Sequence, residues 1–336
     1  MRKFLFAVAL LLGIAFVLGR LAEMHAIIAT LRQGDIRYLL LALVVQGLWF
    51  FNAGLHLKVI YRALGLKESL LRLSLMVVGA NFFSVVVPSG GLSGLSVYIA
   101  EARHQGYPTS RATVAGVIYM FFEYVGFLGM LALGLVVLVR RNHLTAADVT
   151  ASVLMALLAL GLGVMLYLGT HSGPLLSRVL VALTRGINRA LRPFLRRPYL
   201  SEHNARLFGL DAGEGLQAIR QRPHAMLWPI FLGSLSKALQ VIVLWVLFLA
   251  FRVPCSVGTV VAGFAIAYLF LIISPTPSGI GIVEGVMTVA LNSLNVRLSA
   301  AVVLTLAYRG ITFWIPFLLG PLALRALARL PRPAEK

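Results

Sequence analysis

The chain has 336 residues, of which 60% are hydrophobic and only 12% are charged, and its mean hydropathy is +0.91. Soluble domains carry about 25% charged residues, so this composition excludes an ordinary soluble protein and indicates a polytopic membrane protein. The net charge of +19 lies mostly between apolar stretches, where it predicts contact with anionic membrane lipids and not with nucleic acid. The single cysteine, Cys255, excludes an internal disulfide bond and a site with several thiolate ligands.

Six apolar stretches are long enough to cross a bilayer, which takes roughly 20 helical residues. The first, residues 4–21, resembles a signal sequence, but the residues after it lack a small-x-small cleavage site, so we expect an uncleaved span. Residues 23–37 predict a short interfacial helix. The other five spans are expected at 38–57, 110–139, 150–170, 225–251 and 300–324.

Two further segments, 70–104 and 257–294, each contain an apolar helix, a break and a second apolar helix. Proline and glycine end helices, and here they interrupt apolar runs, so we predict two helical hairpins within the bilayer. Broken helices in both halves of a membrane protein point to a substrate site. The breaks are Pro88-Ser89-Gly90-Gly91 and Pro277-Ser278-Gly279.

The distribution of lysine and arginine predicts the orientation. With the N-terminus inside and each hairpin returning to its own side, 21 of them lie on the inner side and seven on the outer side. Cytoplasmic loops hold the excess of basic residues, so both termini are expected in the cytoplasm of a protein of the cell membrane. Units 38–139 and 225–324 then have opposite orientations. The expected fold is a single all-α transmembrane domain with about six full spans and two broken hairpins in inverted-topology repeats.

The polar segment 172–223 is expected to be a basic cytoplasmic loop with nine arginines. Five of them interleave with apolar residues, a pattern typical of a helix on a membrane surface. Two interpretations stay open, because the segment either gathers anionic lipids or only fixes the topology. The five are Arg185, Arg189, Arg192, Arg196 and Arg197.

Ionisable residues inside spans cost on the order of 2.5–3.5 kcal/mol each, so they usually have a partner or face water. Two acids and two bases can neutralise one another, and a purely structural pairing is one interpretation. We favour a functional role because Glu284 lies on the helix that follows the second break. The four residues are Glu123, Lys237, Glu284 and Arg309.

The breaks suit an anion. A helix that starts at Ser89 or Ser278 leaves its first amides unsatisfied and directs its positive dipole end at the gap, as in phosphate sites. Gly90, Gly91 and Gly279 would let a head group approach the backbone. Alternatively, the Gly-x-x-x-Gly steps that end at Gly94 and Gly285 only pack helices together.

Other candidates are weaker. Asn52 and His56 lie on one face of the second span, and we interpret them as a satisfied polar pair, with a larger polar network as the alternative. The sequence has no Walker A loop, no His-Glu-x-x-His, no Gly-x-Ser-x-Gly and no aspartate-rich diphosphate motif. We therefore expect neither ATP-driven pumping by this chain nor a cofactor or metal.

Two segments, NFFSVVVPSGGLSG from Asn81 and PTPSGIGIVEGVMTVALNSLNVRLSAAVVLTLAYRG from Pro275, resemble the flippase-like membrane proteins related to the transmembrane domain of lysylphosphatidylglycerol synthases. The resemblance extends over most of residues 1–328. The family often has Pro-Gly-Gly where this chain has Pro277-Ser278-Gly279. The most specific pattern is Pro275, Pro277, Gly279, Gly281, Glu284, Tyr308 and Arg309.

The resemblance implies movement of lipid between leaflets. Only residues 325–336 follow the last predicted span, so we expect no aminoacyl-transferase domain and no lysyl transfer. Relatives handle varied lipids, including polyisoprenoid-linked sugars and hopanoids. We therefore predict a flippase for a phosphate-bearing or isoprenoid-type lipid, whose phosphate meets both breaks and either Lys237 or Arg309. Glu123 and Glu284 are expected to balance charge or take up a proton. The alternatives are a membrane-embedded lipid-modifying enzyme, with Glu123 or Glu284 as base and His56 as helper, and a scaffold for such an enzyme.

Overall fold

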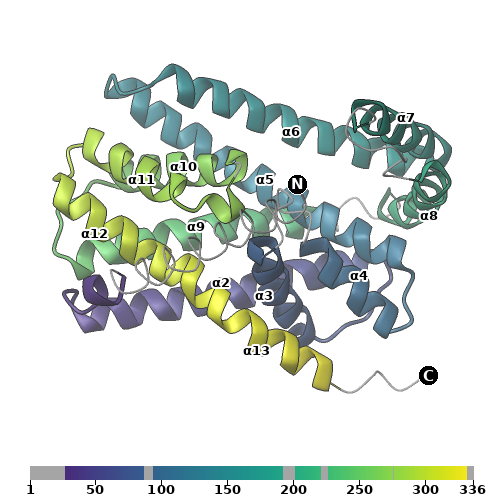
Figure 1. The fold of residues 1–336 in the computed structure, drawn as a ribbon, viewed down its shortest axis with the longest axis horizontal. Helices are drawn as coiled ribbons and strands as arrows, with labels where there is room; N and C mark the ends of the chain where they lie inside the picture. Colours follow the sequence, from purple (N-terminus) through teal and green to yellow (C-terminus); the bar gives the residue numbers. More distant parts are fainter. Residues whose placement is uncertain (1–26, 87–93, 192–200, 221–225, 275, 331–336) are drawn as a thin grey trace, which may run out of the picture.

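The computed structural model describes residues 27–86, 94–191, 201–220, 226–274 and 276–330. Every regular element in these ranges is helical, and the long helices lie side by side in one layered bundle (Figure 1). The first half contains α2 (Ile36–Ala63), α3 (Leu70–Val86), α4 (Leu95–His104), α5 (Thr109–Arg140) and α6 (Ala146–His171). The rest contains α7 (Gly173–Leu191), α8 (Glu202–Arg220), α9 (Leu227–Ala250), α10 (Val257–Ile273), α11 (Ile282–Ser293), α12 (Leu298–Arg309) and α13 (Ile315–Arg329).

Five helical segments are long and apolar enough to cross a membrane: α2, α5, α6, α9 and the continuous helix Leu298–Arg329. They coincide with five of the six predicted spans and confirm a polytopic, all-helical membrane fold. The remaining predicted span, residues 4–21, lies outside the described residues. Large apolar side chains such as Leu157 and Leu160 of α6 are exposed, as expected where lipid is the solvent.

Polar caps define where several of these helices begin. Asp35 caps α2 and accepts a hydrogen bond from the Arg37 amide, so the interfacial helix expected at 23–37 ends earlier, with residues 27–31 helical. Residues 23–26 lie outside the described residues. Thr145 and Asp148 form a capping box at the start of α6, and Ser256 caps α10.

Units 38–139 and 225–324 make corresponding contacts. Helix α2 packs on α9, and α3 packs on α13 much as α10 packs on α5. The pairs α3–α4 and α4–α5 correspond to α10–α11 and α11–α12. This is the packing expected of two related units, while their opposite orientation in the membrane stays a prediction.

The polar segment 172–223 folds largely as two amphipathic helices, α7 and α8, which lie across one end of the bundle (Figure 1). The two helices approach closely because small residues lie where they cross. A Cβ added to Gly209 of α8 would lie 2.5 Å from the Cα of Ser177 of α7. Arg185 forms an exposed ion pair with Glu202 at 2.8 Å. Arg192, Arg196 and Arg197 lie outside the described residues, and the lipid-gathering role stays a prediction.

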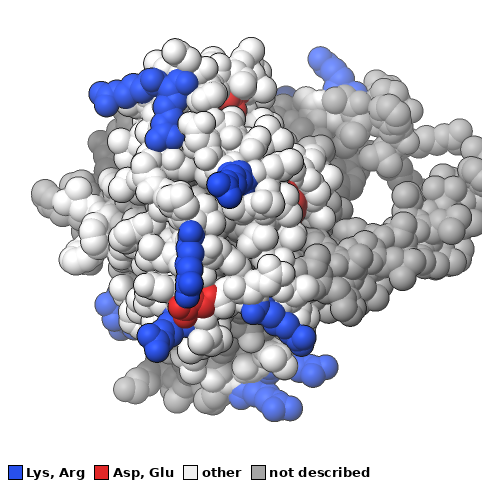
Figure 2. All heavy atoms as spheres, turned by 90° about the vertical axis from the view of Figure 1, so that its left-hand side faces the viewer, with Lys and Arg blue, Asp and Glu red and all other residues white. Residues whose placement is uncertain are grey.

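The opposite end of the bundle holds the connections α5–α6, α9–α10 and α11–α12 (Figure 1). Figure 2 shows this end, where lysine and arginine side chains are spread over a mostly uncharged surface. Arg141 joins two of the connections by donating hydrogen bonds to Ser256 Oγ at 2.9 Å and to Thr259 Oγ1 at 3.1 Å. This is the end that the charge distribution predicts to lie outside.

Candidate functional site

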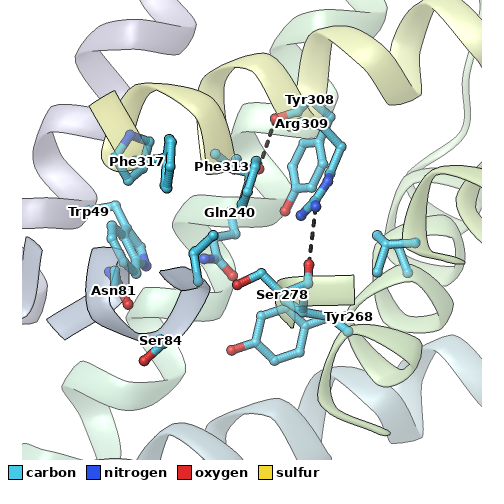
Figure 3. A pocket seen from close by; sticks show the side chains of 16 residues that line it. Trp49, Asn81, Ser84, Gln240, Tyr268, Ser278, Tyr308, Arg309, Phe313 and Phe317 are labelled. Atoms are coloured by element: carbon cyan, nitrogen blue, oxygen red, sulfur yellow. Dashed lines mark hydrogen bonds between the residues drawn. The ribbon is translucent and has the colours of Figure 1, made fainter. Parts of the chain in front are cut away.

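A cavity of about 180 Å³ lies between the two halves of the chain (Figure 3). Its wall from the first half is formed by α2 and α3, and its wall from the second half by α9, α10, the second break, α11 and the helix α12–α13. Figure 3 shows Trp49, Phe313 and Phe317 on one side of the cavity and Arg309, beside Tyr308, on another. The polar side chains that line it belong to Trp49, Asn81, Ser84, Gln240, Tyr268, Ser278, Tyr308, Arg309 and Thr312.

Among the described residues that line the cavity, Arg309 is the charged one. Its Nε donates a hydrogen bond to Glu284 Oε1 at 2.5 Å, and its Nη2 donates to the carbonyl oxygen of Ser278 at 3.1 Å (Figure 3). The guanidinium carbon lies 4.3 Å from the centre of the Phe313 ring, within range of a cation–π contact. A short π-helix, Gly310–Trp314, follows directly, and such turns are frequent at functional sites.

The second break corrects one sequence prediction. Helix α11 begins at Ile282 and not at Ser278, because Ser278, Gly279 and Gly281 all have positive φ angles of 50°, 70° and 79°. This left-handed backbone cannot continue a right-handed helix. Ser278 therefore presents its carbonyl oxygen to Arg309 instead of an amide to a phosphate. The positive end of α11 has its own counter-charge, since Glu284 lies in the first turn.

Two buried polar atoms on the cavity wall have no hydrogen-bond partner among the described residues. They are Gln240 Oε1 and Trp49 Nε1, an acceptor and a donor. Buried polar atoms are normally satisfied, so an unpaired donor and acceptor mark positions that a polar ligand or water can occupy. The cavity thus combines one cation, unpaired polar atoms and aromatic walls.

A second charged centre lies at the crossing of α5 and α9. Lys237 Nζ donates hydrogen bonds to Glu123 Oε2 and to the Tyr268 hydroxyl, both at 2.5 Å. His56 Nδ1 lies 3.4 Å from Glu123 Oε1. Lys237 and His56 are both 0% exposed. Since Tyr268 also lines the cavity, it connects this centre to Arg309's surroundings.

Small residues allow these helices to cross so closely. A Cβ added to Gly126 of α5 would lie 2.6 Å from the backbone carbonyl carbon of Gly233 on α9. Next to this crossing, Asn52 of α2 joins α2 to α9, because its Nδ2 donates hydrogen bonds to the Leu232 carbonyl at 2.9 Å and to Ser236 Oγ at 3.2 Å. The close crossing brings the carboxylate of α5 within reach of the lysine of α9.

Asn52 and His56 are not the satisfied pair that the sequence predicted. Asn52 bonds to α9, while neither ring nitrogen of His56 has a hydrogen bond among the described residues. The reason is that both lie where α2 packs against α9, so the groups near them come from other helices and not from α2. The larger polar network, weighed above as the alternative, describes this region better.

Two predicted site residues, Ser278 and Arg309, line the cavity, and Glu284 is held next to it by its ion pair with Arg309. Glu123 and Lys237 lie behind it. Pro277 and Gly279 belong to the short 3₁₀ turn of the break. Pro88, Ser89, Gly90 and Gly91 lie outside the described residues, although the end of α3 that precedes them contacts the 3₁₀ turn.

The glycine steps behave differently in the two hairpins. A Cβ added to Gly94 would lie 2.8 Å from Ser84 Oγ, so this glycine does pack against α3. Gly281 and Gly285 have nothing within 4 Å of an added Cβ among the described residues, and they line a groove of about 700 Å³ beside α10 and the α5–α6 connection. Helix packing therefore does not explain the second step.

Sequence reasoning missed Gln240, Tyr268 and Trp49. The rule that selected the four charges also applies to uncharged polar residues in apolar spans, and it would have found Gln240. Arg72 lies within the first predicted hairpin and is buried on α3. It bonds Glu101 Oε1 at 3.1 Å and lies 3.5 Å from Glu68 Oε2, which closes the base of the first hairpin. Partial burial raises the pKa of the Glu68 carboxyl, and Arg72 opposes that rise.

Comparison with known proteins gives a consistent result. The family model described as "Lysylphosphatidylglycerol synthase TM region" matches residues 4–320. The UPF0104 membrane protein MJ1595 of Methanocaldococcus jannaschii is 24% identical over 344 aligned residues, which cover 96% of this chain and 95% of that protein. Both matches span the two hairpins and the cavity between them.

Proposed function

The chain belongs to the family of lysylphosphatidylglycerol synthase transmembrane regions, and from this we propose that it is a flippase for membrane lipids. Family membership implies a membrane role related to lipids. The finer proposal is that the chain moves a phosphate-bearing or isoprenoid-type lipid between leaflets. The observation that carries it is Arg309, held beside a broken helix on the wall of a cavity that both halves of the chain line.

The head group binds in this cavity while the tails stay in the lipid. A phosphate oxygen replaces the Ser278 carbonyl as the acceptor for Arg309 Nη2, because charge-assisted hydrogen bonds to anions are stronger than those to neutral carbonyls. Gln240 Oε1 and Trp49 Nε1 supply an acceptor and a donor for other head-group atoms. The break at Pro88–Gly91 stays in the proposed site on sequence grounds.

The size of the cavity limits what it holds in this conformation. Pockets for drug-sized ligands are about 300–1,000 Å³, and this cavity of about 180 Å³ is smaller. It accommodates part of a head group but no acyl chain. Transport therefore requires the two halves to separate at one side of the membrane and then at the other, as in other transporters built from repeats.

The enzyme alternative has less support. His56 is fully buried and is not among the residues that line the cavity, so it does not touch a substrate bound there. A lipid-modifying enzyme would form product in detergent without a membrane. The scaffold alternative requires no transport at all.

The experiment is a leaflet-exchange assay in vesicles that contain the purified protein. Fluorescent phosphatidylglycerol and an isoprenoid phosphate are tested separately, with phosphatidylcholine for comparison. We expect exchange of at least one anionic lipid to be faster than in protein-free vesicles. Folded protein that exchanges none of these lipids would overturn the proposal. Arg185→Gln, which alters an exposed ion pair remote from the cavity, is a matched control and should exchange lipid like the unchanged protein.

A further inference from the structure

The interior charges around the cavity balance one another. Among the described residues there are two acids, Glu123 and Glu284, and two bases, Lys237 and Arg309, joined in two ion pairs. An anionic head group that enters the cavity therefore adds a negative charge that nothing in this arrangement neutralises. Uncompensated charge in a membrane interior costs on the order of kilocalories per mole, so a second ion has to accompany the lipid.

His56 is the group that can supply this charge. Its ring is buried, neither nitrogen has a hydrogen bond among the described residues, and Nδ1 lies 3.4 Å from Glu123 Oε1, which also has no hydrogen bond. A neutral imidazole leaves the centre with no net charge, and an imidazolium leaves it with one positive charge. Histidine is the side chain that changes between these states near neutral pH.

Titratable and charged side chains lie near His56 on each of the helices that pack around it. Helix α5 contributes Glu123 and Tyr119, whose ring centre lies 4.8 Å from that of His56. Helix α9 contributes Lys237, and α10 contributes Tyr268 through its bond to that lysine. On α2 itself, Lys58 and Tyr61 are the nearest titratable residues along the chain. The one charged residue of α3, Arg72, is paired with Glu68 and Glu101 in a separate cluster.

A continuous chain of polar contacts links the cavity to this histidine. Tyr268 lines the cavity and its hydroxyl accepts from Lys237, Lys237 donates to Glu123, and Glu123 faces His56. Protons move along such chains by exchange between neighbouring groups. The net step is protonation only: one O–H bond of a hydronium ion in the solution breaks, one N–H bond forms at an imidazole nitrogen, and a water molecule is left.

We propose that the His56–Glu123 centre is a proton-binding site that takes up one proton when an anionic head group enters the cavity. The inference rests on the proposed function and adds its driving force. One negative lipid and one proton then move together, so transport is electroneutral. A pH gradient drives it, and a membrane potential does not.

The first test measures protons directly, in detergent and without transport. Short-chain phosphatidylglycerol is added to the protein in weakly buffered solution near neutral pH, and proton uptake is followed with a pH indicator while lipid binding is measured in parallel. We expect uptake approaching one proton per bound lipid, and none with short-chain phosphatidylcholine. Binding without proton uptake overturns this inference alone. Failure of any anionic lipid to bind overturns the proposed function as well.

The second test uses variants in vesicles. A gradient of one pH unit is a tenfold proton ratio, so one-to-one coupling predicts an asymmetry of anionic lipid between leaflets of about tenfold. His56→Gln should slow exchange of anionic lipid and abolish this asymmetry, and His143→Gln, which changes an exposed histidine, should retain both. Exchange by the unchanged protein that ignores the pH gradient, or follows an imposed membrane potential, contradicts the proposal. The unchanged protein decides the question even if His56→Gln does not fold.

Discussion

The two ion pairs near the cavity each join a glutamate to a basic residue, but their surroundings differ. Glu284 and Arg309 stand at a broken helix, and Arg309 lines the cavity and also holds a backbone carbonyl. Glu123 and Lys237 lie at a tight crossing of two unbroken helices, and neither lines the cavity. The difference indicates a division of tasks, in which the first pair receives the ligand and the second joins the two halves and balances charge.

The largest expected effect is on stability at the tight crossing. Lys237→Met leaves Glu123 buried without its cation, and breaking a buried pair in this way costs about 3–5 kcal/mol of unfolding free energy. The double variant Glu123→Gln with Lys237→Met should recover most of that loss, because no charge stays unpaired. Unfolding in mixed micelles by chemical denaturation measures both.

Equal stability of the single and double variants would break the comparison. It would mean that Glu123 is hydrated or neutral in the folded protein. In that case the crossing would depend on helix packing alone, and its charges would have no structural role.

The next effect is on transport at the cavity. Arg309→Gln removes a charge-assisted donor worth about 1.5–3 kcal/mol, so exchange of anionic lipid should fall about 10- to 100-fold. Arg309→Lys should recover only part of the rate, because it keeps the charge but cannot contact Glu284 and the ligand with a planar fork. Leaflet-exchange rates for the three proteins provide the measurement. An exchange rate that Arg309→Gln leaves unchanged would show that Arg309 does not contact the head group.

A smaller effect concerns helix packing. Gly126→Ala places a methyl group 2.6 Å from the Gly233 backbone, so the helices must separate at a cost of about 1–3 kcal/mol. Gly129→Ala on the same helix meets nothing within 4 Å among the described residues, and it should be neutral or stabilise by about 0.5–1 kcal/mol through helix propensity. Thermal unfolding compares the two variants. Similar melting temperatures would show that α5 and α9 do not cross closely enough at Gly126 to exclude a methyl group.

The smallest effect is expected on the amphipathic helices. Arg185→Gln removes an exposed ion pair with Glu202, and such pairs contribute about 0.2–1 kcal/mol. Chemical denaturation should therefore barely distinguish this variant from the unchanged protein. A loss as large as that of Lys237→Met would contradict the contrast between buried and exposed pairs.

The spans were predictable from the sequence because bilayer thickness sets their length. Residues 110–139, for example, were expected to span, and α5 covers Thr109–Arg140. The pairing of the charges was not predictable, because it depends on where the helices cross. Glu123 meets Lys237 since Gly126 and Gly233 face each other, and no pattern along one chain reports that contact.

The second break illustrates another limit. Pro277-Ser278-Gly279 correctly predicted an interrupted helix, but Pro, Ser and Gly are compatible with several turn types. The left-handed conformation of Ser278 moved the helix start to Ile282 and exchanged an expected amide for a carbonyl. The sequence likewise placed Asn52 and His56 on one face of their helix. It could not show that neither ring nitrogen of His56 has a hydrogen bond among the described residues, because the groups near that ring come from distant parts of the chain.

The most direct test of the account is leaflet exchange by the double variant Glu284→Gln with Arg309→Gln. This variant removes both charges together, so no buried charge is left unpaired to unfold the protein. With folding verified by thermal unfolding, we predict that exchange of anionic lipid falls to the rate of protein-free vesicles. Exchange at the rate of the unchanged protein would contradict the assignment of the cavity as the place where the head group binds.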